Sequence, residues 1–229
     1  VYPDSGDGFE LLARRARHRV FIIGRGRLAA ATQSAVRRTG VTVRASEQPA
    51  ALAELAEQAE LADRGQPSAA YGVVVLVGED AVSTRSGAAL VAEHRPHLAV
   101  VAGADRAMVG PLVLPGRSAC LRCLELYRTD RDPGWPAIAA QLDDPPAAPR
   151  GESTLTELVA ALVALQVICW ADEHRTPASL GATLTVTLPD GLIERRPWAM
   201  HPRCGCGWLA ASLPADRTAT AELRIPPDR

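Results

Sequence analysis

The fold is decided by the stretch Val20-Phe-Ile-Ile-Gly-Arg-Gly-Arg-Leu-Ala29. Its first four residues form a short apolar run that stops at Gly24, which is typical of a buried strand. From Leu28 to Arg38 the apolar residues recur at helical spacing, and Gly40 follows where a helix would end. This order predicts a strand, a glycine turn and a helix.

The rest of the chain continues this alternation of strands and helices. We expect further strands at 41–43, 71–77, 97–101 and 108–114, helices at 49–63, 84–93 and 153–171, and an edge hairpin formed by 183–188 and 192–198. Strands that alternate with helices favour a Rossmann-like, doubly wound, mostly parallel α/β sheet, here with a C-terminal β-hairpin region. We expect a polar N-terminal lead-in over 1–17, one α/β domain over 18–208 and a C-terminal tail over 209–229.

Charge and composition exclude several kinds of partner and chemistry. The net charge of -1 and the pI near 6.6 give no electrostatic reason to expect a nucleic-acid or membrane partner. No stretch has the length of a secretory core or the roughly 18 apolar residues of a membrane span, so we expect a cytoplasmic protein. All 25 basic residues are Arg. The absence of Lys excludes Schiff-base chemistry, a phosphate-loop lysine and a lysine general base.

Four of the five cysteines form two close pairs. Cys120 and Cys123 are spaced CxxC, and Cys204 and Cys206 follow some 80 residues later as CxC. Each pair can supply two corners of a tetrahedron, so the pattern predicts a structural zinc ion that staples the C-terminal end to the core. With four protein ligands no position remains for water, and the metal should not be catalytic. The alternatives are a redox pair beside two small buried residues, or His201 in place of one ligand.

The glycine turn admits two interpretations. Gly24, Gly26 and Ala29 match the GxGxxA turn of dinucleotide-binding folds, placed between a strand and a helix as that motif requires. Arg44, however, ends the second predicted strand where an acid would hold a ribose hydroxyl, although an NADP phosphate would tolerate it. The glycines could instead serve only the tight turn and close helix packing. Asp80 and Asp105 follow strand ends, at a ligand-binding edge or in solvated loops.

The assembled pattern resembles the ThiF/MoeB superfamily, the ubiquitin-activating type of adenylating domain, over roughly residues 18 to 208. More closely, three strings resemble actinobacterial ThiF-like proteins of thiazole/oxazole-modified microcin (TOMM) pathways: Val109-Gly-Pro-Leu-Val-Leu-Pro-Gly-Arg-Ser-Ala-Cys-Leu-Arg-Cys-Leu124, Arg131-Asp-Pro-Gly-Trp-Pro136 and His201-Pro-Arg-Cys-Gly-Cys206. The resemblance implies a scaffold that binds a precursor leader peptide and docks on a YcaO-type cyclodehydratase, and a possible homodimer.

The chain departs from the adenylating members of that superfamily in the groups that hold ATP. It has no Lys, no acid at Arg44 and no Asn-x-x-Arg-Gln segment. Bound triphosphate would lack most of its charge compensation, so we expect a degenerate, non-catalytic nucleotide turn. In the TOMM relatives an N-terminal winged helix grips the leader, and the stretch ahead of Val20 is too short for one. The chain is then either a fragment or a docking platform alone.

Three functional hypotheses follow. The leading one is a zinc-stapled, non-catalytic partner of the cyclodehydratase that binds or delivers the precursor peptide. The first alternative is an ATP-dependent adenylyltransferase acting on a protein or peptide C-terminus. The second is an NADP-binding oxidoreductase.

Overall fold

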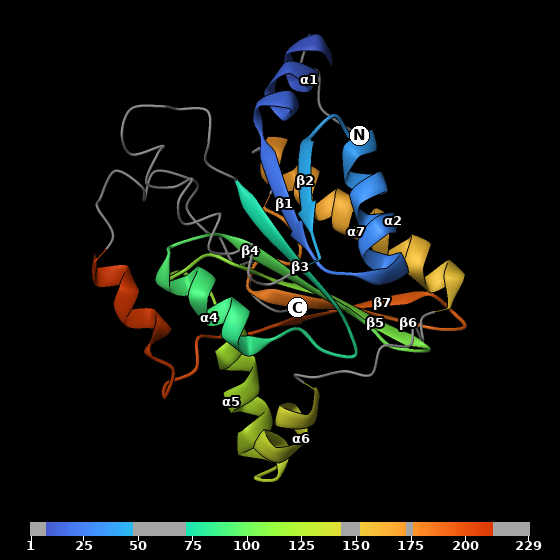
Figure 1. Cartoon of the computed structure of the whole chain (residues 1–229). Coiled ribbons are helices and arrows are strands. Elements are labelled where there is room, and N and C mark those ends of the chain that lie inside the picture. The colour runs from blue at the N-terminus through green and yellow to red at the C-terminus, as the bar shows by residue number, and fades with distance from the viewer. Residues whose placement is uncertain (1–7, 48–71, 143–151, 173–175, 213–229) are drawn as a thin grey trace.

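The predicted strand, glycine turn and helix are present as β1 (Arg19–Ile23) and α2 (Gly26–Arg38) (Figure 1). The structure is a computed structural model, and it describes residues 8–47, 72–142, 152–172 and 176–212. The other described elements are α1 (Gly8–Arg17), β2 (Thr42–Ser46), β3 (Val73–Glu79), α4 (Thr84–Ala92), β4 (His97–Ala102), β5 (Arg106–Val113), α5 (Leu121–Arg131), α6 (Trp135–Leu142), α7 (Ser153–Asp172), β6 (Ala182–Thr187), β7 (Leu192–Pro197) and the 3-10 helix η1 (Gly205–Ser212). The helix expected at 49–63 lies outside the described residues.

The strands form one mixed sheet in the order β2-β1-β3-β4-β5-β6-β7. The first four strands run parallel to one another, and β5, β6 and β7 extend the sheet in antiparallel fashion. The predicted α/β class and C-terminal hairpin are confirmed. The antiparallel part is larger than the hairpin alone, because β5 folds back on β4 after the short turn at 103–105 and presents its other edge to β6.

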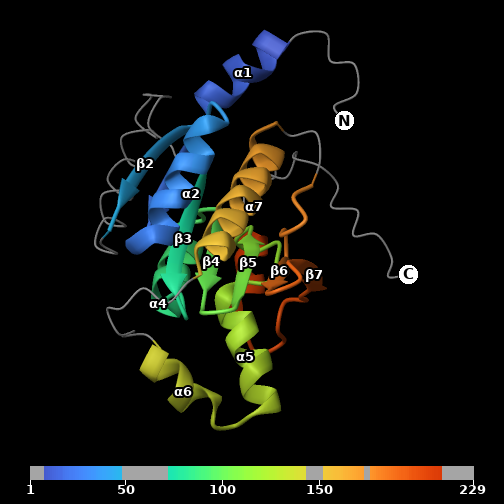
Figure 2. The same cartoon turned by 90° about the vertical axis from the view of Figure 1, so that its right-hand side faces the viewer.

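Helices cover both faces of the sheet, as Figure 2 shows. On one face α2 and α7 pack on alternate residues of the parallel strands, among them Val20 and Ile22 of β1. On the other face Leu90 of α4 and Leu121 of α5 pack on Phe21 and Ile23. The β1 strand is therefore apolar at every central position because both of its faces are buried.

The α7 helix is central, as its apolar sequence predicts. By length and composition it could cross a membrane, but 56% of its most apolar stretch is buried inside the protein. It packs against α2 and β5, and Leu155, Val159 and Val163 on this side are fully buried. Its apolar character is thus largely explained by the core.

The segment predicted as a polar lead-in contains the helix α1. Arg15 near its end forms a bidentate pair with Asp172 of α7, with N···O distances of 2.7 and 2.5 Å. The two side chains are 11% and 3% exposed. This pair fastens α1 to the end of α7, 157 residues away in sequence. The predicted domain limits themselves stay a prediction.

His97 at the start of β4 is fully buried, and Nδ1 lies 3.0 Å from the carbonyl oxygen of Arg95. Burial lowers the pKa of His97 from 6.5 to about 4, so the folded protein keeps it neutral where the unfolded chain binds a proton. We expect the free energy of unfolding to fall by about 3 kcal/mol from this group as the pH falls from 7 to 4. Denaturant titrations at both pH values, on wild type and His97→Leu, measure the effect. Equal pH dependence in the two proteins would contradict it.

Candidate metal centre and adjoining pocket

The four cysteines of the two close pairs converge on one buried point. Cys120 immediately precedes α5 and Cys123 lies in the first turn of that helix. Cys204 immediately precedes η1 and Cys206 lies in its first turn. Their four sulfur atoms all lie within 4.8 Å of one another, and all four side chains are buried. The predicted convergence of the two pairs is confirmed.

The sulfur distances fit a tetrahedral metal ion. Sγ of Cys120 lies 3.7 Å from those of Cys123 and Cys204, and Sγ of Cys123 lies 3.4 Å from that of Cys206. Zinc–sulfur bonds of about 2.3 Å in a tetrahedron place the sulfurs about 3.8 Å apart. A disulfide requires about 2.05 Å, so these cysteines are free thiols. The cluster can hold a metal ion, and zinc is the soft-tolerant divalent ion that this ligand set favours.

The shifted pKa values of the clustered thiols favour a bound cation. A hydrogen bond from Cys120 and the backbone N–H of His201 lower the pKa of the Cys123 thiol to about 4. That thiolate then opposes ionisation of its neighbours: the hydrogen bond with Cys123 raises the pKa of Cys120, and burial raises the pKa of Cys206 to about 12. Four thiolates can share this site only if a positive ion compensates them.

His201 supports the cluster without joining it. Its backbone N–H donates to Sγ of Cys123 at 3.3 Å. Both ring nitrogens are engaged elsewhere, since Nε2 lies 2.8 Å from Asp130 Oδ2 and Nδ1 accepts the N–H of Arg203. The hydrogen bond with His201 lowers the pKa of Asp130. The alternative in which His201 replaces one cysteine is therefore not the arrangement in the structure.

The glycine turn is held tightly against β3. A Cβ atom at Gly24 would lie 2.5 Å from the carbonyl oxygen of Val77, so close strand packing alone requires glycine there. Gly26 has a φ of +85° and begins α2, where Oε1 of Glu79 lies 2.8 Å from the position of a Cβ. Ala29 is buried in the first turns of α2. A carboxylate thus lies beside the helix N-terminus, where nucleotide-binding folds place a phosphate.

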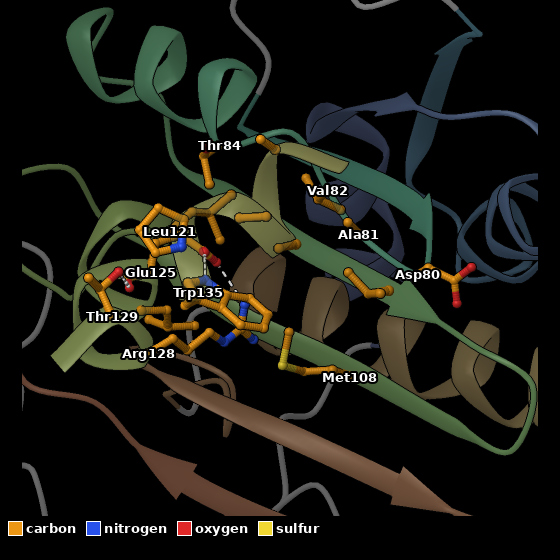
Figure 3. Close-up of a pocket in the computed structure, with 16 residues that line it drawn as sticks. Asp80, Ala81, Val82, Thr84, Met108, Leu121, Glu125, Arg128, Thr129 and Trp135 are labelled. Carbon is orange, nitrogen blue, oxygen red and sulfur yellow. Dashed lines mark hydrogen bonds and ion pairs between the residues drawn. The ribbon is translucent and has the colours of Figure 1, made fainter. Parts of the chain in front are cut away.

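A pocket of about 390 Å³ lies between β4, β5 and the loop after β3 on one side and α5 and α6 on the other (Figure 3). Most of its lining is apolar, and Asp80, which follows the end of β3, is one of its few acidic residues. The residues that line it are Asp80, Ala81, Val82, Thr84, Ala99, Val101, Met108, Leu121, Leu124, Glu125, Arg128, Thr129, Trp135, Pro136, Ala139 and Ala140.

Three side chains from α5 and α6 build one wall of the pocket. The carboxylate of Glu125 accepts hydrogen bonds from Trp135 Nε1 and from Arg128 Nη1, the latter at 2.7 Å. The guanidinium of Arg128 lies over the Trp135 ring, 4.9 Å from its centroid. These contacts hold the Trp135 indole in place: its N–H is bonded to Glu125, and its ring lies toward the pocket, as Figure 3 shows.

The helix α5 joins the pocket to the metal centre. Cys123 faces the other sulfurs, while Leu124, Glu125 and Arg128 line the pocket. The sequence does not predict this pocket wall, although Trp135 lies in the string Arg131-Asp-Pro-Gly-Trp-Pro136, which carries part of the resemblance. Asp105 is not among the lining residues, so of the two acids predicted at strand ends only Asp80 reaches the pocket.

Comparison with solved structures finds the same fold elsewhere. E. coli MccB matches with a TM-score of 0.57 at 16% identity, over 86% of this chain and 67% of MccB. The heterocyclase TruD matches with a TM-score of 0.62 at 17% identity, over 86% of this chain and 28% of TruD. The chain shares the fold of most of MccB and of part of TruD. A structure of MccB with SeMet MccA gives a TM-score of 0.59 at 17% identity, over 87% of this chain and 69% of that one.

No family model matches the chain, and no curated protein matches it. At 16 to 17% identity the structural likeness shows the fold alone. The chain spans about two thirds of the length of MccB and less than a third of that of TruD.

Proposed function

We propose that this chain is a non-catalytic, zinc-stapled partner of a YcaO-type cyclodehydratase and binds the precursor of a ribosomally made, azole-modified peptide. The observation that carries the proposal is the likeness to TruD, a heterocyclase, of which this chain matches 28%. MccB, the second neighbour, is a microcin C7 biosynthetic enzyme solved in complex with N-formylated MccA. We therefore assign to this chain the role of a peptide-binding component in a peptide-modifying system.

The glycine turn supports a role without ATP chemistry. Glu79 places a carboxylate beside the N-terminus of α2, and a phosphate there would meet a like charge. No Lys exists in the chain to offset the charge of a triphosphate. Arg25 and Arg27 of the turn are exposed to solvent, which weakens their effect on a bound anion.

The pocket under α5 and α6 supports peptide binding. Its volume of about 390 Å³ and apolar lining suit a large apolar side chain, and Trp135 offers a fixed aromatic face. No described residue of the pocket is a cysteine, histidine or lysine. Recognition of a peptide side chain, rather than covalent chemistry, is the role that this lining suits.

Reconstitution tests the proposed function. The chain is mixed with Mg-ATP and with the cyclodehydratase and precursor peptide encoded in the same gene cluster, and azoline formation, the step before oxidation to the azole, is followed by the loss of about 18 Da of water per ring in the peptide mass. We expect modification to require this chain and the chain alone to leave the peptide unchanged. Modification at full rate without the chain would contradict the proposal.

Filling the pocket is expected to weaken peptide binding. Ala139 of α6 lines the pocket, and Ala139→Phe would occupy much of it. We expect the Kd for the precursor peptide to rise at least about tenfold, the loss of one buried apolar contact. Ala137→Phe on the same helix is the matched control, because Ala137 is exposed and does not line the pocket. Fluorescence anisotropy with labelled peptide measures both, and equal Kd values would exclude the pocket as the site.

An ATP-dependent adenylyltransferase is the second candidate, favoured by the strand, glycine turn and helix and by the structure of MccB with ATP. An NADP-binding oxidoreductase is the third, favoured by Arg44 at β2. Isothermal titration with Mg-ATP and with NADPH separates them. We expect a Kd no tighter than about 1 mM for either nucleotide, which corresponds to a binding free energy of about 4 kcal/mol. Micromolar affinity for either nucleotide would overturn the leading proposal in favour of that candidate.

A further inference from the structure

The helix α5 presents two sides to two different parts of the protein. Residues three, four or seven apart share one side of a helix. The residues of one side that contact the segment 198–206 are Cys123, Tyr127 and Asp130. The residues of the other side that line the pocket are Leu124, Glu125 and Arg128. The metal centre and the pocket are therefore built on two sides of one helix.

His201 meets the first of these sides at three places. Its backbone N–H donates to Sγ of Cys123 at 3.3 Å. Its ring lies edge-on to the ring of Tyr127, with the centroids 4.6 Å apart, and its Nε2 lies 2.8 Å from Asp130 Oδ2. The helix rises about 10 Å between Cys123 and Asp130, so this one buried residue spans two turns of α5.

The ring of His201 is held in a single orientation. Nδ1 accepts the backbone N–H of Arg203 at 3.1 Å, so Nε2 carries the proton that Asp130 accepts. The side chain of Arg203 pairs with the other carboxylate oxygen of Asp130. Both nitrogens of a ring in a residue that is 4% exposed are thus bonded, and the ring is fixed against α5.

The pocket wall depends on where the second half of α5 lies. Trp135 of α6 is held by Glu125 and Arg128 of α5, as Figure 3 shows. Among the described elements, α6 packs mainly on α5. A displacement of this half of α5 would move both partners of Trp135 at once.

We infer that His201 is a positioning residue that ties the metal centre to the pocket through α5. The two cysteines of the segment 198–206 fix that segment at the metal centre. His201 then holds the second half of α5, and that half places Glu125 and Arg128 against Trp135. Coupling between two binding sites is reciprocal, so a ligand in the pocket should tighten metal binding. This last consequence rests on the proposed function, whereas the link from His201 to Trp135 stands without it.

Fluorine NMR of protein labelled with 5-fluorotryptophan tests that link without any peptide. Trp135 reports on the pocket wall and Trp170 of α7 is the internal control, with each signal assigned by a Trp→Phe variant. We expect His201→Ala to keep its zinc, because His201 is not a ligand, and to shift or broaden the Trp135 signal beyond any change at Trp170. His201→Gln can still donate to Asp130 and should restore the wild-type signal. A zinc-loaded His201→Ala protein with an unchanged Trp135 signal would overturn the inference.

Asp130→Ala tests the same link at a position where folding is not at stake. The side chain of Asp130 is 45% exposed, so its removal leaves the core intact. We expect the Trp135 signal to change in this variant too. Arg131→Ala, at the next exposed position of α5, is the matched control and should leave it unchanged. The same Trp135 signal in both variants would place the support of the pocket wall elsewhere.

Equilibrium competition with a zinc chelator measures the coupling itself. The zinc Kd is determined with and without a saturating amount of the precursor peptide from the same gene cluster. We expect the peptide to lower the zinc Kd of wild type at least about fivefold and to have a smaller effect on Asp130→Ala. An unchanged zinc Kd while fluorescence anisotropy shows bound peptide would refute the coupling. A peptide that does not bind would count against the proposed function, and the fluorine signals would still decide the role of His201.

Discussion

Cys123→Ser is expected to release the metal ion and to destabilise the protein by several kcal/mol, up to about 10 kcal/mol. Its sulfur is the most connected of the four, with two cysteine neighbours and the N–H of His201. The metal joins α5 to η1 across 83 residues of chain, so its loss frees the C-terminal end of the described chain. Metal content by mass spectrometry and the free energy of unfolding in urea measure the two effects.

Cys169→Ser is the matched control for this prediction. Cys169 lies half-buried on α7 and is not a member of the four-cysteine cluster. We expect this variant to keep the full metal content and nearly the wild-type stability. A Cys123→Ser protein with one metal ion per chain and an unchanged free energy of unfolding would show that the cluster is not a metal centre.

Arg15→Met is expected to cost about 3 to 5 kcal/mol of unfolding free energy. The change leaves the carboxylate of Asp172, 3% exposed, without the guanidinium that it meets through two hydrogen bonds. A buried charge that loses its counter-ion is far less stable than the pair, and α1 loses this bidentate pair with α7. Urea unfolding followed by circular dichroism gives the free energy.

A double variant separates the pair from the helix itself. Arg15→Met/Asp172→Leu removes both charges together, and we expect it to recover most of the lost stability. Arg17→Met, at an exposed position of the same helix, should change the free energy of unfolding by less than about 0.5 kcal/mol. Equal losses in Arg15→Met and Arg17→Met would mean that the Asp172 pair contributes nothing.

The parts of the fold that rest on local patterns could be predicted from the sequence. The run from Val20 to Ile23 reads as a strand because both of its faces are buried, and the glycines after it permit the tight approach to Val77. The four cysteines could be matched because two close pairs are each half of one tetrahedral site. In both cases the deciding chemistry lies within a few neighbouring residues.

The parts that rest on distant contacts could not be predicted. Gly8–Arg17 is short and contains three arginines, and its docking involves Asp172, which no local pattern links to Arg15. The pocket wall needs Trp135 to meet Glu125 across a turn between two helices, and no local pattern links these two residues. The direction of β5 likewise depends on pairing with β4 and β6 more than on its own residues.

The account depends most on one metal ion bound by four sulfurs, and X-ray absorption at the zinc edge of the purified protein tests it most directly. We predict one zinc ion per chain with four sulfur neighbours at about 2.3 Å and no nitrogen or oxygen ligand. Protein purified with no bound metal, or zinc with nitrogen or oxygen in its coordination sphere, would contradict the four-cysteine centre.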